Sequence, residues 1–229
     1  ANTRVKNVAL VDCTAELFLE ASYSSPVFIS DFIGQNGGAQ TDGCEYSTAR
    51  AAQFRNVSTA SDFLKAVALT EADPAASINV NILADLDFGA AQSEWKFISE
   101  AAFEIRGNGH KIKNARLTET LEAADVAASD TLGLFGSLKG AKISGVTFES
   151  CSVTVTLNAV PASGKFFVGL LAGYADGGTA LTGLTATGCS VTVVVTASGV
   201  DLYTGQLAGE NAATILDCDF NGVIVSATP

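Results

Sequence analysis

The sequence of 229 residues contains no methionine, a single tryptophan and a single histidine. One histidine argues against a histidine-based catalytic triad. The Gly-x-Ser-x-Gly nucleophile motif, the His-Glu-x-x-His zinc motif and the phosphate-binding loop are also missing. No Cys-x-x-Cys spacing occurs, which argues against a zinc site. We therefore expect no enzyme activity and no catalytic, cofactor-binding or metal site.

Basic residues are scarce, with 13 Lys and Arg against 24 Asp and Glu, a formal net charge of −11. Such a chain cannot neutralise phosphates, so we expect no nucleic acid or anionic membrane surface as a partner. No stretch approaches the roughly 18 apolar residues that span a bilayer, so we expect no membrane insertion. The chain is 48% hydrophobic and 16% charged, with 22 Gly. This composition is too apolar for disorder and too rich in Gly and Thr for a helical bundle, which favours an all-β fold.

The most ordered pattern is a stretch that recurs three times between residues 132 and 225. Its copies open with Leu132–Gly136, Val168–Gly173 and Thr204–Gly209. An apolar rhythm with steps of 3, 2, 3 and 2 residues follows each opening. It comprises Ile143, Val146, Phe148, Cys151 and Val153, then Leu181, Leu184, Ala186, Cys189 and Val191, then Ile215, Cys218, Phe220, Val223 and Val225. A step of 2 indicates a strand and a step of 3 a corner, so the period predicts a solenoid.

Stacking the copies predicts three inward ladders of equivalent residues. They are Val146, Leu184 and Cys218; Phe148, Ala186 and Phe220; and Val153, Val191 and Val225. We expect the glycines at places where a positive φ or a close approach of coils excludes a Cβ.

The chain before the repeats is expected to hold a helix and less regular coils. An amphipathic helix is expected near residues 59–71, because Thr59 or Ser61 can cap its start and Pro74 follows its end. This helix would cover the open core of the first coil. Strands are expected between Ile78 and Phe88, and a degenerate coil between residues 103 and 117. The acidic, Ala-rich stretch of residues 119–130 is expected to form a loop or a short helix.

Residues 1–56 do not fit the repeat, so we place a boundary between them and a β-helix of residues 57–229. Strands are expected at Val5–Val11, at Ala15–Ala21 and at Val27–Ile29, and a loop at Gly34–Gly43. This segment could cap the solenoid, pair with its sides or form a small β-subdomain, and the sequence leaves the three alternatives open.

Five cysteines cannot all pair within one chain. Cys13 and Cys44 could form a disulfide in the N-terminal segment. Cys151, Cys189 and Cys218 fall on inward positions of the rhythm, where we expect small buried hydrophobic residues. Cys151 and Cys189 share one position of the repeat, so a disulfide between adjacent coils is also open.

The repeat openings Gly-Leu-Phe-Gly, Gly-Leu-Leu-Ala-Gly and Gly-Gln-Leu-Ala-Gly resemble the GLUG repeats of bacterial cell-surface proteins. The stretch Phe103–Ile112 is similar to the Phe-x-Ile-x-Gly-Asn-Gly-His-x-Ile coil that precedes such repeats. The resemblance covers roughly residues 57–225. It implies a right-handed parallel β-helix with one short capping helix, exported to the surface or outside of a bacterial cell. The start at Ala1, with no apolar signal core, fits a chain whose export signal has been removed.

Three sets of polar residues are candidates for chemistry. His110 could act as a base near Arg106 and Lys111, but Gly-Asn-Gly-His is also typical of a coil corner. Two carboxylate pairs have the spacing i and i+2, which places both members on one strand face; they are Asp85 with Asp87, and Asp217 with Asp219. Such pairs can hold Ca²⁺ or act in acid–base catalysis, but we expect these carboxylates to be solvated.

The third set is a Thr-rich face, with Ser152, Thr154 and Thr156 expected to lie over Ser190, Thr192 and Thr196. Such a face can order water or bind ice, although it is also typical of a soluble strand. Gly222 and Ile224 interrupt it in the third copy. Asn56-Val57-Ser58 has the form of a glycosylation sequon.

The last coil runs past Val225 without an amphipathic cap. Either the chain is a fragment of a longer one, or another chain covers this coil. For the second case we expect a head-to-tail contact with the N-terminal segment of the next subunit, with Val5–Val11 as a candidate donor strand. The expected function is a non-enzymatic extracellular structural or adhesive solenoid, with a filament subunit as one form. The alternatives are a carbohydrate-binding or polysaccharide-degrading β-helix, and a spacer from a larger adhesin. Trp95 is the only tryptophan and the four tyrosines are scattered, which weighs against the carbohydrate alternative.

Overall fold

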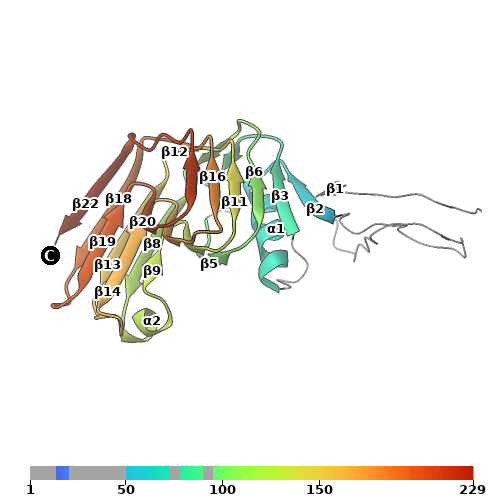
Figure 1. Ribbon diagram of the computed structural model, residues 1–229. Helices are drawn as coiled ribbons and strands as arrows, with labels where there is room; N and C mark the ends of the chain where they lie inside the picture. Colours follow the sequence, from blue (N-terminus) through green and yellow to red (C-terminus); the bar gives the residue numbers. More distant parts are fainter. Residues whose placement is uncertain (1–13, 21–49, 73–77, 90–94, 229) are drawn as a thin grey trace, which may run out of the picture.

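The computed structural model describes residues 14–20, 50–72, 78–89 and 95–228, which form a parallel β-solenoid (Figure 1). Every pairing between its strands is parallel, and each strand pairs with equivalents about one repeat away in the chain. The expected all-β parallel solenoid is thus confirmed. No helix in these ranges has the length and apolar character needed to cross a membrane.

The chain visits five sheets in a fixed order, which we number 1 to 5. Sheet 1 contains β9 (Thr131–Leu132), β14 (Lys165–Gly169) and β19 (Asp201–Gly205). Sheet 2 contains β5 (Ile98–Ala101), β10 (Phe135–Leu138), β15 (Ala172–Ala175) and β20 (Ala208–Asn211). Sheet 3, the longest, contains β1 (Thr14–Glu20), β2 (Arg50–Val57), β3 (Ile78–Ile82), β6 (Glu104–Arg106), β11 (Lys142–Ser144), β16 (Ala180–Thr182) and β21 (Thr214–Leu216).

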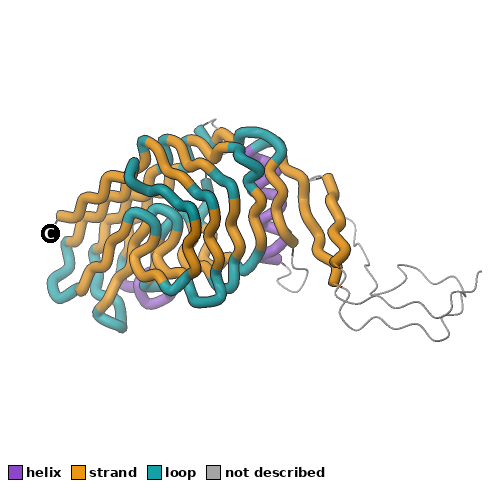
Figure 2. Tube along the Cα trace, turned by 45° about the horizontal axis from the view of Figure 1, so that its top comes forward, coloured by secondary structure: helices purple, strands orange, loops and turns teal. Residues whose placement is uncertain are grey.

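The two remaining sheets complete each coil. Sheet 4 contains β4 (Leu86–Asp87), β7 (Lys111–Lys113), β12 (Thr147–Glu149) and β17 (Thr185–Thr187). Sheet 5 contains β8 (Arg116–Leu121), β13 (Ser152–Leu157), β18 (Cys189–Val195) and β22 (Val223–Thr228). In the described chain sheet 3 starts first, sheet 5 starts one strand later than sheet 4, and sheet 1 starts one strand later than sheet 2, so the cross-section widens along the axis (Figure 2).

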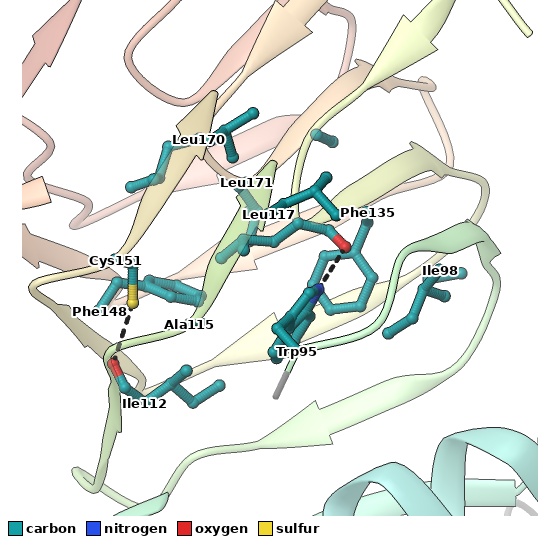
Figure 3. Close-up of a cluster of buried hydrophobic side chains, with 14 of the residues drawn as sticks. Trp95, Ile98, Ile112, Ala115, Leu117, Phe135, Phe148, Cys151, Leu170 and Leu171 are labelled. Atoms are coloured by element: carbon teal, nitrogen blue, oxygen red, sulfur yellow. Dashed lines mark hydrogen bonds between the residues drawn. The ribbon is translucent and has the colours of Figure 1, made fainter. Parts of the chain in front are cut away.

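The inward ladders have the register that the repeat predicts. Phe148 pairs with Ala186, and Val153, Val191 and Val225 are in register. Phe148 and Val191 are almost completely buried. Figure 3 shows part of this core, where Trp95 lies against Phe135. The core is therefore a continuous column of apolar side chains.

The repeat openings are the corners between sheets 1 and 2, and their glycines are required by close packing. A Cβ on Gly169 would clash with the carbonyl oxygen of Ala172 and lie 2.5 Å from the Cα of Ala208 in the next coil. The opening glycines do not have a positive φ, whereas Gly145 and Gly183 do, at the corner between sheets 3 and 4. Both reasons for glycine that the sequence suggests therefore occur, at different corners.

Helix α1 (Ala60–Ala72) covers the core at its N-terminal end, as expected. The hydroxyl of Thr59 accepts the N–H of Asp62 (3.1 Å) and caps the first turn. Phe63 is fully buried, and its ring lies 5.8 Å from that of Phe88 and 5.5 Å from that of Trp95, centroid to centroid.

The acidic, Ala-rich stretch forms a short helix, α2 (Ala123–Ala128), which is one of the two alternatives expected there. It connects β8 to β9, the first strands of sheets 5 and 1 in the described chain. Val126 is buried, so α2 buries apolar surface where these two sheets begin. The widening of the cross-section creates this second start, which the repeat pattern does not encode.

The N-terminal strands β1 and β2 extend sheet 3 in the parallel sense. Strand β1 lies within one residue of the expected second strand. The expected strands Val5–Val11 and Val27–Ile29, the loop Gly34–Gly43, and Cys13 and Cys44 lie outside the described residues.

We predict that Val191→Asp destabilises the fold by more than about 4 kcal/mol, because it places an unpaired charge in a fully buried ladder. Chemical denaturation measures this effect. Thr192→Asp is the matched control, because its side chain alternates to the outer face of the same strand. A cooperative unfolding transition in Val191→Asp equal to that of the wild type would contradict the ladder.

We predict that Gly169→Ala costs about 3 kcal/mol or more, because the backbone atoms that meet the new Cβ belong to two coils. Gly177→Ala is the control, since the only atom within 4 Å of its Cβ is the carbonyl oxygen of Ala212 at 3.9 Å. Equal thermal stability of the two variants would show that the corner tolerates a side chain.

Candidate functional site

The carboxylates of the first coil are held by cations and backbone amides on the outer side of sheet 4. Asp85 Oδ2 lies 3.0 Å from Lys113 Nζ, and Asp85 Oδ1 accepts the Lys111 N–H at 3.0 Å. The hydrogen bond from Lys113 and the Lys111 N–H lower the pKa of Asp85. Asp87 accepts Asn114 Nδ2 at 2.8 Å and the N–H of Gly89 at 2.9 Å, and both lower its pKa. These carboxylates connect the first coil to the second.

His110 does not converge with Arg106 and Lys111. Its Nδ1 lies 3.6 Å from Asp85 Oδ1. Arg106 donates to Glu104 (2.7 Å) and lies over the ring of Phe54, and Lys111 pairs with Glu149 (2.6 Å). The three candidates therefore have separate partners. The Gly-Asn-Gly-His stretch forms a turn with positive φ at Asn108 and Gly109.

A row of asparagine side chains that the repeat pattern does not predict joins the ends of three strands. Asn81 Nδ2 donates to Asn56 Oδ1 and Asn108 Nδ2 donates to Asn81 Oδ1, both at 2.8 Å. Asn108 Nδ2 also reaches the carbonyl of Ile82 (2.9 Å). The sequence signal for this row is an Asn followed by an apolar residue, which occurs in Asn56-Val57 and again in Asn81-Ile82. The two asparagines lie side by side because β2 and β3 pair in register.

The second carboxylate pair does not share a strand face. Asp217 has a φ of 53° and occupies the corner that follows β21, while Asp219 makes an isolated bridge to Thr185. Asp219 Oδ1 accepts the N–H of Asn221 (2.9 Å). Asp and Asn tolerate the left-handed conformation better than most residues, so Asp217 replaces the glycine of the earlier coils.

The Thr-rich face is on sheet 5, with one correction. Ser152 pairs with Ser190 and Thr154 with Thr192, as expected, but Thr156 pairs with Val194. Thr196 lies beyond the strand, where its hydroxyl donates to the carbonyl of Leu157 (3.2 Å) and to Asn158 Oδ1 (2.8 Å). Arg116 and Ile224 interrupt the column of Ser152 in the flanking coils, whereas the column of Thr154 and Thr192 continues through Thr118 and Ser226.

A groove of about 560 Å³ lies beside β8, the first strand of sheet 5. Its described lining is Phe88, Gly89, Trp95, Lys96, Phe97, Asn114, Arg116, Leu117, Thr118 and Glu119. Trp95 is buried and its Nε1 donates to the carbonyl of Leu134 (3.0 Å; Figure 3), so its ring is not a platform for a sugar. Glu119 is the only carboxylate in this lining, whereas glycoside hydrolysis by the usual route needs two.

The terminal coil, residues 201–228, exposes Ile215 where earlier coils bury its equivalents, and it carries Leu216 and Ile224 at outward positions that hold Thr182 and Ser190 in the preceding coil. Ile215 is 44% exposed, although Leu181 and Ile143 at the same position of the two preceding coils are at most 2% exposed. Leu216 is 55% and Ile224 73% exposed. This surface is the strongest candidate for an interaction site in the described chain.

Comparison with protein-family models, with curated protein sequences and with solved structures found no match. Among the described residues, no group of three or more His, Cys, Asp or Glu side chains is placed to hold a metal ion.

Asp176 joins two coils between sheets 2 and 3. Its Oδ1 accepts the N–H of Gly140 in the preceding coil (2.9 Å), the N–H of Gly178 (3.0 Å) and the hydroxyl of the buried Thr179 (2.9 Å). The Gly140 N–H and the Thr179 hydroxyl lower the pKa of Asp176. A lowered folded-state pKa contributes stability that is present above the unfolded pKa and lost as the pH falls through the folded pKa.

We therefore predict that the Tm falls as the pH drops below about 4, the unperturbed range of Asp. Asp176→Asn should lower the Tm at neutral pH and reduce the slope below pH 4, because the amide does not titrate. Calorimetry between about pH 2 and 7 measures the Tm at neutral pH and its slope at acid pH, because this range covers the ionisation of Asp. Asp201→Asn, at an exposed position of β19, is the control. If the Tm of Asp176→Asn fell with pH below about 4 as steeply as the Tm of Asp201→Asn, Asp176 would not be the source of the acid sensitivity.

Proposed function

We propose that this protein is a non-enzymatic, extracellular structural or adhesive solenoid whose terminal coil binds a second copy of the chain. The proposal rests on one observation, the apolar surface that the terminal coil exposes. Of the seven large hydrophobic side chains exposed in the described chain, four belong to this coil: Tyr203, Ile215, Leu216 and Ile224. Exposed apolar surface concentrated in one place is typical of an interaction site.

A second copy fits this surface because the two ends of sheet 3 are complementary. The free edge of β21 lies at one end and β1 at the other, and all strands of the sheet are parallel. A copy translated along the axis would place its β1 beside β21 in the same parallel sense. Phe18 of β1 is 44% exposed, so this end also presents an apolar side chain.

Such a contact is heterologous, because different surfaces of the two copies meet. Heterologous contacts that do not close produce filaments. The five parallel edges of a solenoid add further strands by the same hydrogen bonding that builds each coil. A head-to-tail filament is therefore the form of assembly that we favour.

The proposed location and adhesive role follow from the resemblance to GLUG repeats of bacterial surface proteins. The opening glycines fit that resemblance, since each corner between sheets 1 and 2 requires them for close packing. Export to the bacterial surface is part of the proposal. The groove beside β8 supports the second candidate, carbohydrate binding, because half-buried Phe97 and Glu119 line it with Arg116.

We predict that the wild type associates with increasing concentration and that the double variant Leu216→Lys/Ile224→Lys stays monomeric. Sedimentation velocity measures this, at raised ionic strength to screen the net charge of −11. Val160→Lys is the matched control, because Val160 is 43% exposed but lies in the loop between β13 and β14, in the coil before the terminal one. A monomeric wild type at high concentration would refute the proposal.

The direction of assembly is tested by mixing two blocked variants. Phe18→Lys removes the apolar residue of the β1 end and keeps the terminal coil, whereas the double variant keeps the β1 end. Head-to-tail contact predicts that each variant alone is monomeric and that an equal mixture forms dimers but no longer species. Association of Phe18→Lys with itself would instead indicate contact between two terminal coils.

A further inference from the structure

Two cysteines occupy the same position in consecutive coils, at the corner between sheets 4 and 5. The residues that follow them, Ser152 and Ser190, are paired in register, and the Ser190 N–H donates to the carbonyl of Cys151 (3.0 Å). Both side chains are 1% exposed thiols. Cys218 belongs to a different corner, between sheets 3 and 4, where its Sγ donates to the carbonyl of Leu181 (3.6 Å).

The spacing of the coils suits a covalent bond between Cys151 and Cys189. Neighbouring strands of a sheet lie about 4.8 Å apart, and Cα atoms of bonded cysteines are usually about 4.4–6.8 Å apart. Cys189 Sγ already lies 3.4 Å from the backbone nitrogen of Cys151. Cys151 Sγ points to the preceding coil, where it donates to the carbonyl of Ile112 at 3.4 Å (Figure 3).

Only one of the two sulfurs has to turn. Cys189 Sγ leans toward the coil of Cys151, where it also donates to the carbonyl of Phe148 (3.5 Å). Cys151 has to leave the carbonyl of Ile112 and rotate about χ1 toward Cys189. Ala115, in the equivalent position of the coil before, is small, so the neighbouring side chain does not hold Cys151 in place.

The chemistry of the pair is asymmetric. The neighbouring Cys151 side chain and, after it, the Cys151 N–H that Cys189 Sγ accepts lower the pKa of Cys189, while the neighbouring Cys189 side chain and burial raise the pKa of Cys151. The thiolate is the species that attacks a disulfide. Cys189 is therefore the nucleophile of the pair, and Cys151 is the thiol that resolves the intermediate.

We propose that Cys151 and Cys189 are a dithiol site that a disulfide-bearing oxidant converts into a bond between consecutive coils. In the first step Cys189 sulfur attacks the oxidant's disulfide, forming a mixed disulfide and releasing one thiol. In the second step Cys151 sulfur attacks Cys189 sulfur, and the second oxidant thiol leaves. The two protein thiols together lose two electrons, which the disulfide of the oxidant accepts. The two thiol protons pass to the released thiols or to water.

Access to the buried pair is through the terminal coil. Cys189 pairs with Val223 of β22, and the next residue of that strand, Ile224, is 73% exposed. Strand β22 is paired on one side only in the described chain, and such edge elements open at lower free-energy cost than the middle of a sheet. Opening of β22 would expose Cys189 before Cys151, the order in which the proposed chemistry uses them.

The experiment treats the reduced full-length protein with oxidised glutathione, alkylates the remaining thiols under denaturing conditions and maps the peptides without reduction. We expect a cross-linked pair containing Cys151 and Cys189. Trypsin separates Cys151 from Cys189 by cleaving after Lys165. No Lys or Arg follows Lys165, so Cys189 and Cys218 stay on one tryptic peptide, and a second protease that cleaves at acidic residues separates them. We also expect the Tm to rise by about 10 °C on oxidation, because the bond closes a long loop.

Three variants control the result. Cys218→Ser should keep both the cross-link and the Tm shift. Cys151→Ala and Cys189→Ala should lose both, and because Ala115 occupies the same position in an earlier coil, each should keep a cooperative melt when reduced. Recovery of Cys151 and Cys189 as alkylated thiols after oxidation would overturn the proposal, as would a cross-link between Cys189 and Cys218.

Discussion

Each coil of this protein is covered by the next coil, and the remaining features depend on this packing along one axis. Parallel in-register pairing places equivalent side chains on top of one another, so Leu181 is fully buried between Ile143 and Ile215. Ile215, with a coil on one side only, is 44% exposed. In such a stack, stability is approximately a sum of coil stabilities and nearest-neighbour terms. One sequence pattern therefore produces a closed core in the middle and an open one at the end.

The core register could be predicted from the sequence because it depends on local periodicity alone. Steps of 2 place alternate residues on one face, so Phe148 over Ala186 and Val153 over Val191 follow from counting. The same counting from Ser190 arrives at Val194, and the expectation of Thr196 was wrong because that residue lies beyond the end of β18. Helix α2 marks the start of two additional sheets, a property of the whole cross-section that no single repeat contains.

Polar partners were less predictable, because they depend on residues about one coil away. The alternation of Asp85 and Asp87 indicated exposure, but the pairing of Asp85 with Lys113 follows from the stacking of β4 on β7. Asn56 has the form of a sequon, yet its side chain accepts from Asn81. Asp217 has the spacing of a strand residue and lies at a positive-φ corner instead. Hydrogen bonds between coils leave no periodic signal, so such contacts need the register before they can be inferred.

The two directions along the axis are physically different, and this difference constrains any assembly. At the start, α1 inserts Phe63 against Phe88 and Trp95, and α2 buries Val126 where sheets 5 and 1 begin. No described helix has this role at the terminal coil, where Ile215 is exposed at an inward position and Leu216 and Ile224 at outward ones. In the proposed head-to-tail contact, a second copy would add its strands at this end and cover Ile215. The burial of Cys189 beneath β22 places the cysteine pair next to that same end.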